Sequence, residues 1–277
     1  MTPTSVNVRG ARLHIVAEGP SDAPPIVLLH AGIADLRSWD DLVAHLVEAG
    51  FHVVRFDARG HGQSVTEAVA FSPRADLLAV LDAMGITRAA LIGNSRGGGI
   101  AIDTAIESPE RVVAVVGVAA ALGGLETDTP PDEARLWDEM ARIEAADPPD
   151  PDAIVDIDLR VWVDGPGQPP DRVPAALRRE MAIMDRPLYE PGHVEATPID
   201  LDPPAADRLT ELRCPVLAVA GLLDPAGVAQ SARHLAEHAP DARAVIWPHV
   251  AHMIGMEVPD ELAAVIVDFL APLPPWP

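Results

Sequence analysis

One short stretch, residues 93–97, constrains the fold of this chain more than any other feature. It reads Gly-Asn-Ser-Arg-Gly, and two further glycines follow it directly. An apolar run at residues 89–92 comes before it, and a helix-forming run at residues 100–105 comes after it. A serine in this setting is expected on a sharp strand-to-helix turn, with a strained backbone and an exposed hydroxyl. The flanking glycines fit such a turn, which is called a nucleophile elbow where the serine is catalytic. A Cβ at these positions would collide with the adjoining strand and helix.

Strand-like and helical patterns alternate along most of the chain. Apolar runs typical of buried strands lie at residues 26–30, 53–56, 89–92, 112–118, 215–220 and 244–247. Helical patterns lie at residues 39–49, 73–84, 228–238 and 259–270. Residues 5–8 and 11–18 flank Gly10 and predict an opening antiparallel hairpin. This alternation indicates an α/β protein, with a mainly parallel sheet covered by helices on both faces.

The alternation is interrupted between residues 121 and 207, where we expect no buried strand. Apolar side chains recur there at helical spacing, namely Leu136, Trp137, Met140 and Ile143. This periodicity predicts a helical insertion and not a disordered linker. We therefore divide the chain into a core, residues 1–120 and 208–277, and a helical cap or lid, residues 121–207.

The composition excludes several classes of partner and site. The 277 residues are 48% hydrophobic, enough for one large core. The net charge is −22 and no basic cluster occurs, which argues against nucleic acid or an anionic membrane as a partner. The single cysteine, Cys214, excludes an internal disulfide and is expected to be a buried structural thiol. With no signal-peptide pattern and no apolar run of about 20 residues, we expect a soluble, cytoplasmic protein.

Three residues far apart in the sequence form a candidate catalytic triad. A serine nucleophile needs a base, an orienting acid and a site for the oxyanion. Asp224 follows the expected strand at residues 215–220, and His252 follows the one at residues 244–247. Both therefore lie at carboxyl ends of strands, where ligand sites of open α/β sheets gather. The order Ser95, Asp224, His252 is also the one expected after a nucleophile elbow.

Each member also has a structural interpretation. Asp224 precedes a proline and could start a turn or cap the next helix. Ser95 could cap its own helix, and a single histidine such as His252 is more often a surface or core residue. The joint order and placement of the three residues favours catalysis over these separate explanations.

The loop after the expected strand at residues 26–30 is the candidate oxyanion loop. We assign one backbone N–H donor to Gly32 and the second to Arg96. Preorganised donors of this kind contribute about 3–4 kcal/mol each to transition-state stabilisation. His30 is expected to pack and hydrogen-bond beneath the loop, not to act as a base.

These residues give the chain a resemblance to the α/β-hydrolase superfamily over nearly its whole length. The matching segments are residues 28–32, 56–64, 93–98, 108–112 and 257–259, together with Asp224 and His252-Met253. Within the superfamily the chain looks most like small esterases and enol-lactonases with a helical cap. The resemblance implies an eight-stranded, mostly parallel sheet and a nucleophile, base and acid at Ser95, His252 and Asp224. It also implies that no metal and no organic cofactor is needed.

The resemblance further implies that residues 57–64 form a structural turn, so that Arg59 and His61 belong to loop architecture. The chain departs from the family pattern in two places. The usual His-Gly pair before the oxyanion loop is His30-Ala31 here, so that Ile33 could supply the N–H in place of Gly32. The residue after the nucleophile is commonly apolar but is Arg96 here; facing the pocket, it would favour an anionic substrate.

The leading functional hypothesis is a serine hydrolase that cleaves a carboxylic ester or lactone of a small molecule through an acyl-enzyme. A serine nucleophile argues against the carboxylate-based chemistry of haloalkane dehalogenases and epoxide hydrolases. Hydrolysis of a C–C bond and cofactor-free perhydrolysis on the same triad stay open, as does a small-molecule receptor without turnover. Candidate substrate-binding residues are Ile33, Trp137, Met140 and Trp162. The oligomeric state is left open.

Overall fold

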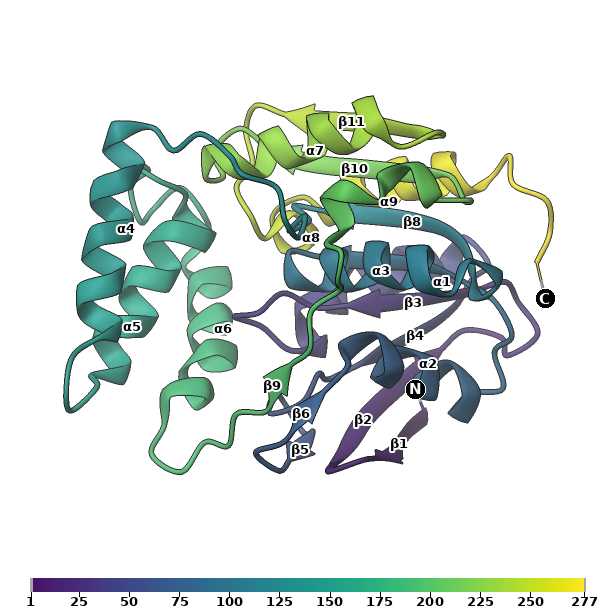
Figure 1. The fold of residues 1–277 in the computed structure, drawn as a ribbon, viewed down its shortest axis with the longest axis horizontal. Coiled ribbons are helices and arrows are strands. Elements are labelled where there is room, and N and C mark those ends of the chain that lie inside the picture. Colours follow the sequence, from purple (N-terminus) through teal and green to yellow (C-terminus); the bar gives the residue numbers. More distant parts are fainter. Residues whose placement is uncertain (1, 277) are drawn as a thin grey trace.

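A single mixed sheet forms the centre of the molecule in the computed structural model, which describes residues 2–276 (Figure 1). Its strands run in the order β1-β2-β4-β3-β7-β8-β10-β11, and the short β5 pairs with β2. The bounds are β1 Thr2–Val8, β2 Ala11–Glu18, β3 Pro25–Leu29, β4 His52–Phe56, β5 Val65–Thr66, β7 Ala89–Asn94, β8 Val112–Val118, β10 Val216–Gly221 and β11 Ala242–Trp247. The strands β4, β3, β7, β8, β10 and β11 pair in parallel, in that order. Strands β1 and β2 form the antiparallel hairpin that the sequence predicted.

Helices cover both faces of this sheet, and the pattern of strand side chains explains why. In β3, Val27 and Leu29 pack into one core cluster, whereas Ile26 and Leu28 pack into the other. The first cluster is covered by α2 (Pro73–Ala83), α3 (Arg96–Glu107) and α7 (Ala226–His238). The second is covered by α1 (Asp40–Glu48) and α9 (Pro259–Leu270), and the short α8 (Ile254–Glu257) lies next to α9. Because both sheet faces are buried, the central strands read as continuous apolar runs.

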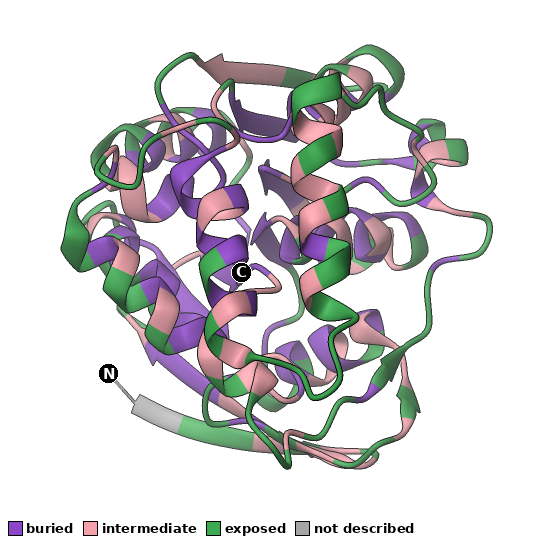
Figure 2. Cartoon of the chain, turned by 90° about the vertical axis from the view of Figure 1, so that its left-hand side faces the viewer, coloured by how far each residue is buried: buried purple, intermediate pink, exposed green. Residues whose placement is uncertain are grey.

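The segment between β8 and β10 forms a separate group of helices beside the sheet (Figure 1). It contains α4 (Pro131–Glu144), α5 (Pro151–Asp158), the π-helical turn Leu159–Asp164 and α6 (Ala175–Asp185). Figure 2 looks onto these helices and shows buried, intermediate and exposed positions alternating along them, with the buried strands behind. Their apolar faces pack against each other and against the core residues Ala31, Ala34 and Met253.

The chain returns from these helices along an extended segment that contains β9 (Thr197–Pro198). This strand pairs with β6 (Ala70–Phe71) in a separate two-stranded sheet, and both residues of β9 are exposed. The expectation of no buried strand in residues 121–207 therefore agrees with the structure. Short 3-10 turns complete the chain at Leu36–Trp39, Pro109–Arg111, Arg186–Tyr189, Ala205–Asp207 and Leu209–Glu211. No helix within residues 2–276 is long and apolar enough to cross a membrane.

A local cap and a tertiary contact decide where two of the helices begin. The helix expected from residue 39 starts one residue later, because a 3-10 turn capped by Asp35 precedes it. Helix α7 was expected from residue 228 but starts at Ala226, whose backbone N–H donates to Glu133 of α4. The first N–H groups of a helix have no partner within the helix, and here the distant Glu133 accepts from one of them.

Candidate active site

Ser95 lies on a strained turn between β7 and α3. Its backbone has φ 55° and ψ −119°, a conformation that non-glycine residues rarely adopt. A Cβ on Gly93 would lie 2.2 Å from the carbonyl oxygen of Gly97, and one on Gly98 would lie 2.5 Å from the Cβ of Ala120. The glycine pattern is therefore required by close backbone packing, and the strained strand-to-helix turn expected from the sequence is present.

The side chains of His252 and Asp224 are in direct contact. The Nδ1 of His252 lies 3.0 Å from Oδ1 and 2.9 Å from Oδ2 of Asp224, and both residues are buried. Burial raises the pKa of Asp224, while the charge and hydrogen bond of His252 act in the opposite direction. A proton on Nδ1 donated to this carboxylate leaves Nε2 as the basic nitrogen of the ring.

Asn94 links the serine turn to the histidine loop. Its Nδ2 donates to the carbonyl oxygen of Val118 and to that of His252, at 3.2 Å in each case. Because Asn94 directly precedes Ser95, this bridge holds the serine turn beside the histidine. The sequence analysis did not identify Asn94, since only the tertiary contact shows its role.

The inserted helices contribute an aromatic cover over the histidine. The ring of Trp162 lies 4.7 Å from that of His252 between centroids, and Trp137 lies 5.4 Å from Trp162. Met140 is buried inside the insertion with Ile157 and Val161, and both tryptophans pack against this cluster. Trp162 is therefore a candidate substrate-binding residue that contacts the histidine.

The loop after β3 approaches the start of α3 closely. A Cβ on Gly97 would lie 2.3 Å from the carbonyl oxygen of Leu29, so only glycine permits this approach. His30 holds the loop, because its Nε2 accepts from the N–H of Ala58 at 2.9 Å and its Nδ1–H donates to the carbonyl of Ala31 at 2.7 Å. Burial lowers the pKa of His30 well below its usual value, which keeps the ring neutral. These contacts are those of a structural histidine.

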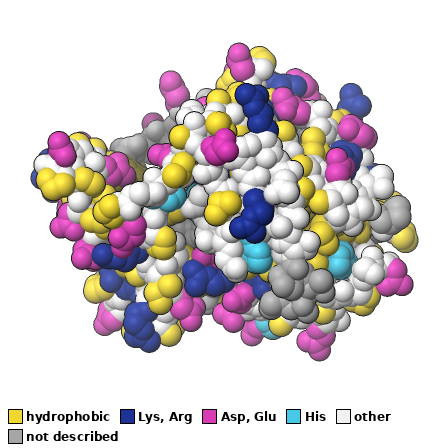
Figure 3. Space-filling model, turned by 90° about the horizontal axis from the view of Figure 1, so that it is seen from below, with side chains coloured by type: hydrophobic (Ala, Val, Ile, Leu, Met, Phe, Trp, Pro, Cys, Tyr) yellow, Lys and Arg dark blue, Asp and Glu magenta, His cyan; other side chains and the backbone are white. Residues whose placement is uncertain are grey.

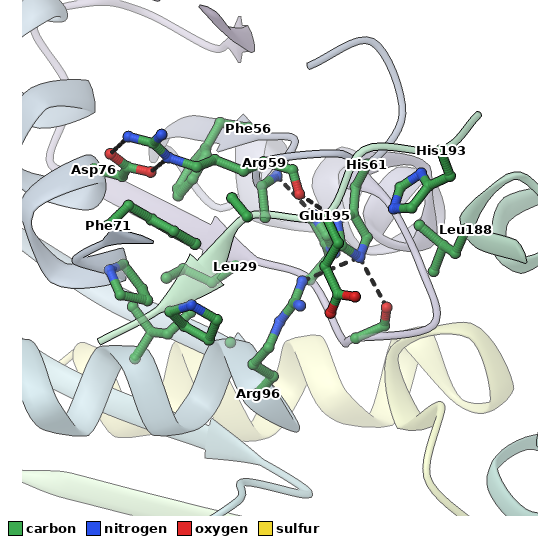
Figure 4. A pocket seen from close by; sticks show the side chains of 18 of the residues that line it. Leu29, Phe56, Arg59, His61, Phe71, Asp76, Arg96, Leu188, His193 and Glu195 are labelled. Carbon is green, nitrogen blue, oxygen red and sulfur yellow. Dashed lines mark hydrogen bonds and ion pairs between the residues drawn. The ribbon is translucent and has the colours of Figure 1, made fainter. Parts of the chain in front are cut away.

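A cavity of about 340 Å³ opens beside this loop (Figure 4). Both candidate oxyanion donors, Gly32 and Arg96, lie on its wall. The apolar part of the wall includes Leu29, Phe56, Phe71, Ile100, Leu188 and Ala196. The polar part includes His61, His193 and Glu195. Figure 4 shows His61 and Glu195 near the guanidinium of Arg96, with His193 beyond His61. The volume is that of a small-molecule site. Its lining residues include neither the triad residues Ser95, Asp224 and His252 nor the candidate substrate-binding residues Ile33, Trp137, Met140 and Trp162.

Comparison with known proteins extends over almost the whole chain. Residues 24–259 match the family model of the alpha/beta hydrolase fold. The chain is 30% identical over 274 residues to rhodomycin D methylesterase DnrP of Streptomyces peucetius, covering 89% of this chain and 90% of that protein. It is 24% identical over 270 residues to 3-oxoadipate enol-lactonase 1 of Acinetobacter baylyi, covering 95% of each.

A solved structure agrees in fold. The enol-lactonase from Burkholderia xenovorans LB400 matches with a TM-score of 0.73 at 23% identity, over 97% of this chain and 100% of that one. The chain belongs to the α/β-hydrolase family. The fold class expected from the sequence is confirmed.

In this hydrolase the turn at residues 57–64 is built as the sequence predicted. The carboxylate of Asp57 accepts from the backbone N–H of Leu36 and of Gln63, at 2.9 and 2.8 Å. Arg59 forms two hydrogen bonds to Asp76, at 2.6 and 2.9 Å. Yet Arg59 and His61 also lie on the cavity wall. The interpretation of His61 as loop architecture alone therefore misses its position beside Arg96.

The hydrolase fold holds the histidine loop with a further acid that the sequence analysis missed. Glu257 accepts from the N–H of Ala251, the residue before His252, at 3.0 Å. Its other oxygen accepts from Arg172 of the insertion at 2.5 Å. Glu257 was noted only as part of a family match, and nothing in its local sequence indicates this contact.

The cysteine and the side chains that could bind a metal complete the description of this hydrolase. Cys214 is buried, and burial raises the pKa of its thiol to about 11, as suits a structural residue. Among residues 2–276, no group of three or more His, Cys, Asp or Glu side chains is arranged to hold a metal ion.

Proposed function

We propose that this carboxylic ester hydrolase cleaves a small-molecule ester or lactone through an acyl-enzyme formed on Ser95. The observation that carries the proposal is the buried His252–Asp224 pair, joined by Asn94 to the strained turn that bears the serine. The named relatives that span most of the chain are a methylesterase and an enol-lactonase, which supports the same class of substrate.

The proposed mechanism assigns one role to each member of the triad. His252 takes the hydroxyl proton of Ser95 through Nε2 as the oxygen attacks the ester carbonyl. Asp224 holds the Nδ1–H tautomer and stabilises the imidazolium that forms. His252 then gives its proton to the leaving alcohol, and the acyl group stays on the serine. In the second half, His252 activates water, which releases the acid and restores the hydroxyl.

Backbone donors of Gly32 and Arg96 would stabilise the oxyanion in both halves of the reaction. Their loops meet where Gly97 touches the carbonyl of Leu29, and both residues line the same cavity. Removing one such donor costs about 3–4 kcal/mol in other serine hydrolases. This pairing supports Gly32 over Ile33 as the donor, because Ile33 is not on the cavity wall.

The helical segment at residues 121–207 is proposed to act as the cap. Trp162 covers the ring of His252, so the insertion excludes water from the base. A closed cap strengthens the electrostatic interactions of the triad, since they act in a medium of lower dielectric constant.

Replacing the nucleophile tests this mechanism. In Ser95→Ala, kcat for p-nitrophenyl esters should fall by at least about 10⁴-fold, because the acyl acceptor is absent. Labelling by a fluorophosphonate probe should disappear as well. Ser21→Ala, at an exposed serine, is the matched control and should behave as the parent chain. Undiminished turnover or labelling in Ser95→Ala would refute the mechanism.

A further inference from the structure

The guanidinium of Arg96 faces the cavity without a neutralising partner. A guanidinium carries five N–H donors. Among residues 2–276 it forms no salt bridge within 4.0 Å, and its one polar side-chain contact joins Nη2 to the Nε2 of His61 at 3.2 Å. The side chain is open to the cavity although protein surrounds it, and this desolvation lowers its pKa. Most of its donors are therefore free to bind a ligand.

Three of the other basic side chains on the cavity wall, His61, His30 and Arg59, do not supply a free cation. Burial and the nearby charge of Arg96 lower the pKa of His61 to about 4, so this ring is neutral at pH 7. His30 is neutral for the same reasons, with burial as the main cause. Arg59 is paired with the carboxylate of Asp76. Arg96 is thus the permanent positive charge that this part of the wall presents to a ligand.

Apolar and charged side chains both line the cavity, and the charged groups near Phe71 are the paired Arg59 and Asp76. Leu29 and Phe71 lie toward one side in Figure 4, and Arg96 reaches toward His61 on the other. A ligand that fills this space would bury an apolar body and place one polar group at the guanidinium. Arginine binds carboxylates through two parallel hydrogen bonds, which suits it to this role.

We propose that this cavity is a substrate subsite for a carboxylate, so that the preferred substrates are esters whose apolar acyl chain ends in a negatively charged group. The inference rests on the proposed function, because it places that chain beside the ester bond attacked by Ser95. The link is the backbone, since Arg96 follows Ser95 directly and also carries a candidate oxyanion donor.

Glu195 also lines this cavity, and its negative charge opposes the binding of a carboxylate to Arg96. Its charge reaches Arg96 across the cavity, yet no ion pair between the two side chains forms. Both Glu195 and Arg96 are exposed, although the protein atoms around Arg96 desolvate its guanidinium. Because its negative charge already acts on the guanidinium of Arg96, Glu195 competes with an incoming carboxylate.

The test compares paired p-nitrophenyl esters of the same acyl length. One member of each pair is the monoester of a dicarboxylic acid, from succinic to suberic, and the other ends in a methyl group. We expect the parent chain to favour the charged ester by about tenfold or more in kcat/KM at the best length. In Arg96→Met the ratio should fall toward one, and Arg96→Lys should restore part of it. We use the ratio of the two kcat/KM values because damage to the oxyanion site would lower kcat/KM for both esters by the same factor.

Control variants separate this effect from a general change in charge. Arg179→Met removes one charge from the exposed face of α6 and should leave the ratio unchanged. Glu195→Gln should raise the ratio, in the opposite direction to Arg96→Met. A ratio near one in the parent chain, or one that Arg96→Met does not alter, would overturn the subsite while the hydrolase function stands.

A binding measurement without turnover tests the carboxylate subsite separately from the proposed hydrolase mechanism. Calorimetry with hexanoate and with hexanamide measures the subsite independently of the triad. Tighter binding of hexanoate in the parent chain, lost in Arg96→Met, supports the subsite even where neither ester is cleaved. Equal binding of both compounds would overturn it.

Discussion

The carboxylate of Asp224 is buried, and both of its oxygens lie at hydrogen-bond distance from one nitrogen of His252. At the scale of single residues, this contact decides which nitrogen of the ring can act as a base. The sequence predicted the two residues from their positions after strands. It could not predict the choice of nitrogen, because that depends on which atoms meet.

Replacing this acid by its amide tests the tautomer. In Asp224→Asn the side-chain amide can donate to Nδ1, which favours the wrong tautomer of His252. We expect kcat to fall by about 10⁴-fold with little change in KM. Steady-state kinetics on a p-nitrophenyl ester measures the effect. Asp138→Asn, at an exposed position of α4, is the control, and a loss of the same size there would contradict the assignment.

His61 makes stability depend on pH in a defined window. Its pKa in the folded chain is about 4, below the ordinary value of 6.5. The unfolded chain therefore takes up this proton first, and stability falls as the pH drops from about 6.5 to about 4. The loss amounts to about 3 kcal/mol, since one pKa unit corresponds to about 1.4 kcal/mol.

Urea denaturation across this window tests the assignment. In His61→Gln the free energy of unfolding should depend less steeply on pH between 4 and 6.5 than in the parent chain. Above pH 6.5 the free energies of unfolding of the two proteins should differ by a constant amount, because His61→Gln loses hydrogen bonds. Equal slopes within the window would show that His61 does not carry this acid sensitivity.

At the scale of elements, the insertion and the histidine loop are joined by Arg172. Its guanidinium donates to the carbonyl oxygens of Val163 and Asp164, at 2.6 and 2.5 Å, and to Glu257 at 2.5 Å. These carbonyls belong to the last two residues of the π-helical turn that carries Trp162. One side chain therefore connects the cover over His252 to the loop that holds it.

Breaking this connection should affect stability and catalysis together. The side chains of Arg172 and Glu257 are 13% and 5% exposed, so removing one partner leaves a buried charge. We expect Arg172→Met to cost about 3–5 kcal/mol of stability and to lower kcat. The double variant Arg172→Met with Glu257→Gln should lose less stability than the summed losses of the two single variants. Additive losses in denaturation experiments would contradict a direct coupling.

The matched control lies elsewhere in the insertion. Arg160 and Glu139 are paired at 2.7 Å but are 40% and 36% exposed. Arg160→Met should therefore cost no more than about 1 kcal/mol. A cost equal to that of Arg172→Met would show that burial does not explain the difference.

The π-helical turn also shows why parts of the insertion were not predicted. Leu159, Val161 and Val163 alternate with the less buried Arg160 and Trp162. Such alternation has the period of a strand, although the segment continues from helix α5. Its conformation depends on packing against α6 and the core loop, which local sequence does not record.

At the scale of the whole molecule, the net charge of −22 sets the long-range electrostatics. Figure 3 shows acidic and basic side chains interspersed over one face, without a large field of one sign there. The excess of acid still destabilises the compact state through repulsion between distant charges. That repulsion acts over about 30 Å at 0.01 M salt but only about 10 Å at 0.1 M.

Raising the salt concentration should therefore stabilise the fold. We expect Tm to rise by a few degrees between 0.01 and 0.3 M sodium chloride, because screening weakens repulsion more than it weakens the buried ion pairs. Differential scanning calorimetry at pH 7 measures the shift. Chloride is chosen because sulfate would stabilise by exclusion from the surface. A fall in Tm would indicate that attractive surface pairs dominate.

The sequence by itself determined the α/β class, the parallel sheet, the helical insertion and the turn at Ser95. These features follow from local rules, namely the period of apolar side chains and the space that a glycine leaves. The tertiary structure alone decided that Asn94 reaches the histidine loop, that Arg172 reaches Glu257 and that Arg96 faces a cavity. Each of these contacts joins elements distant in the chain, so its energy depends on packing geometry that no local pattern contains.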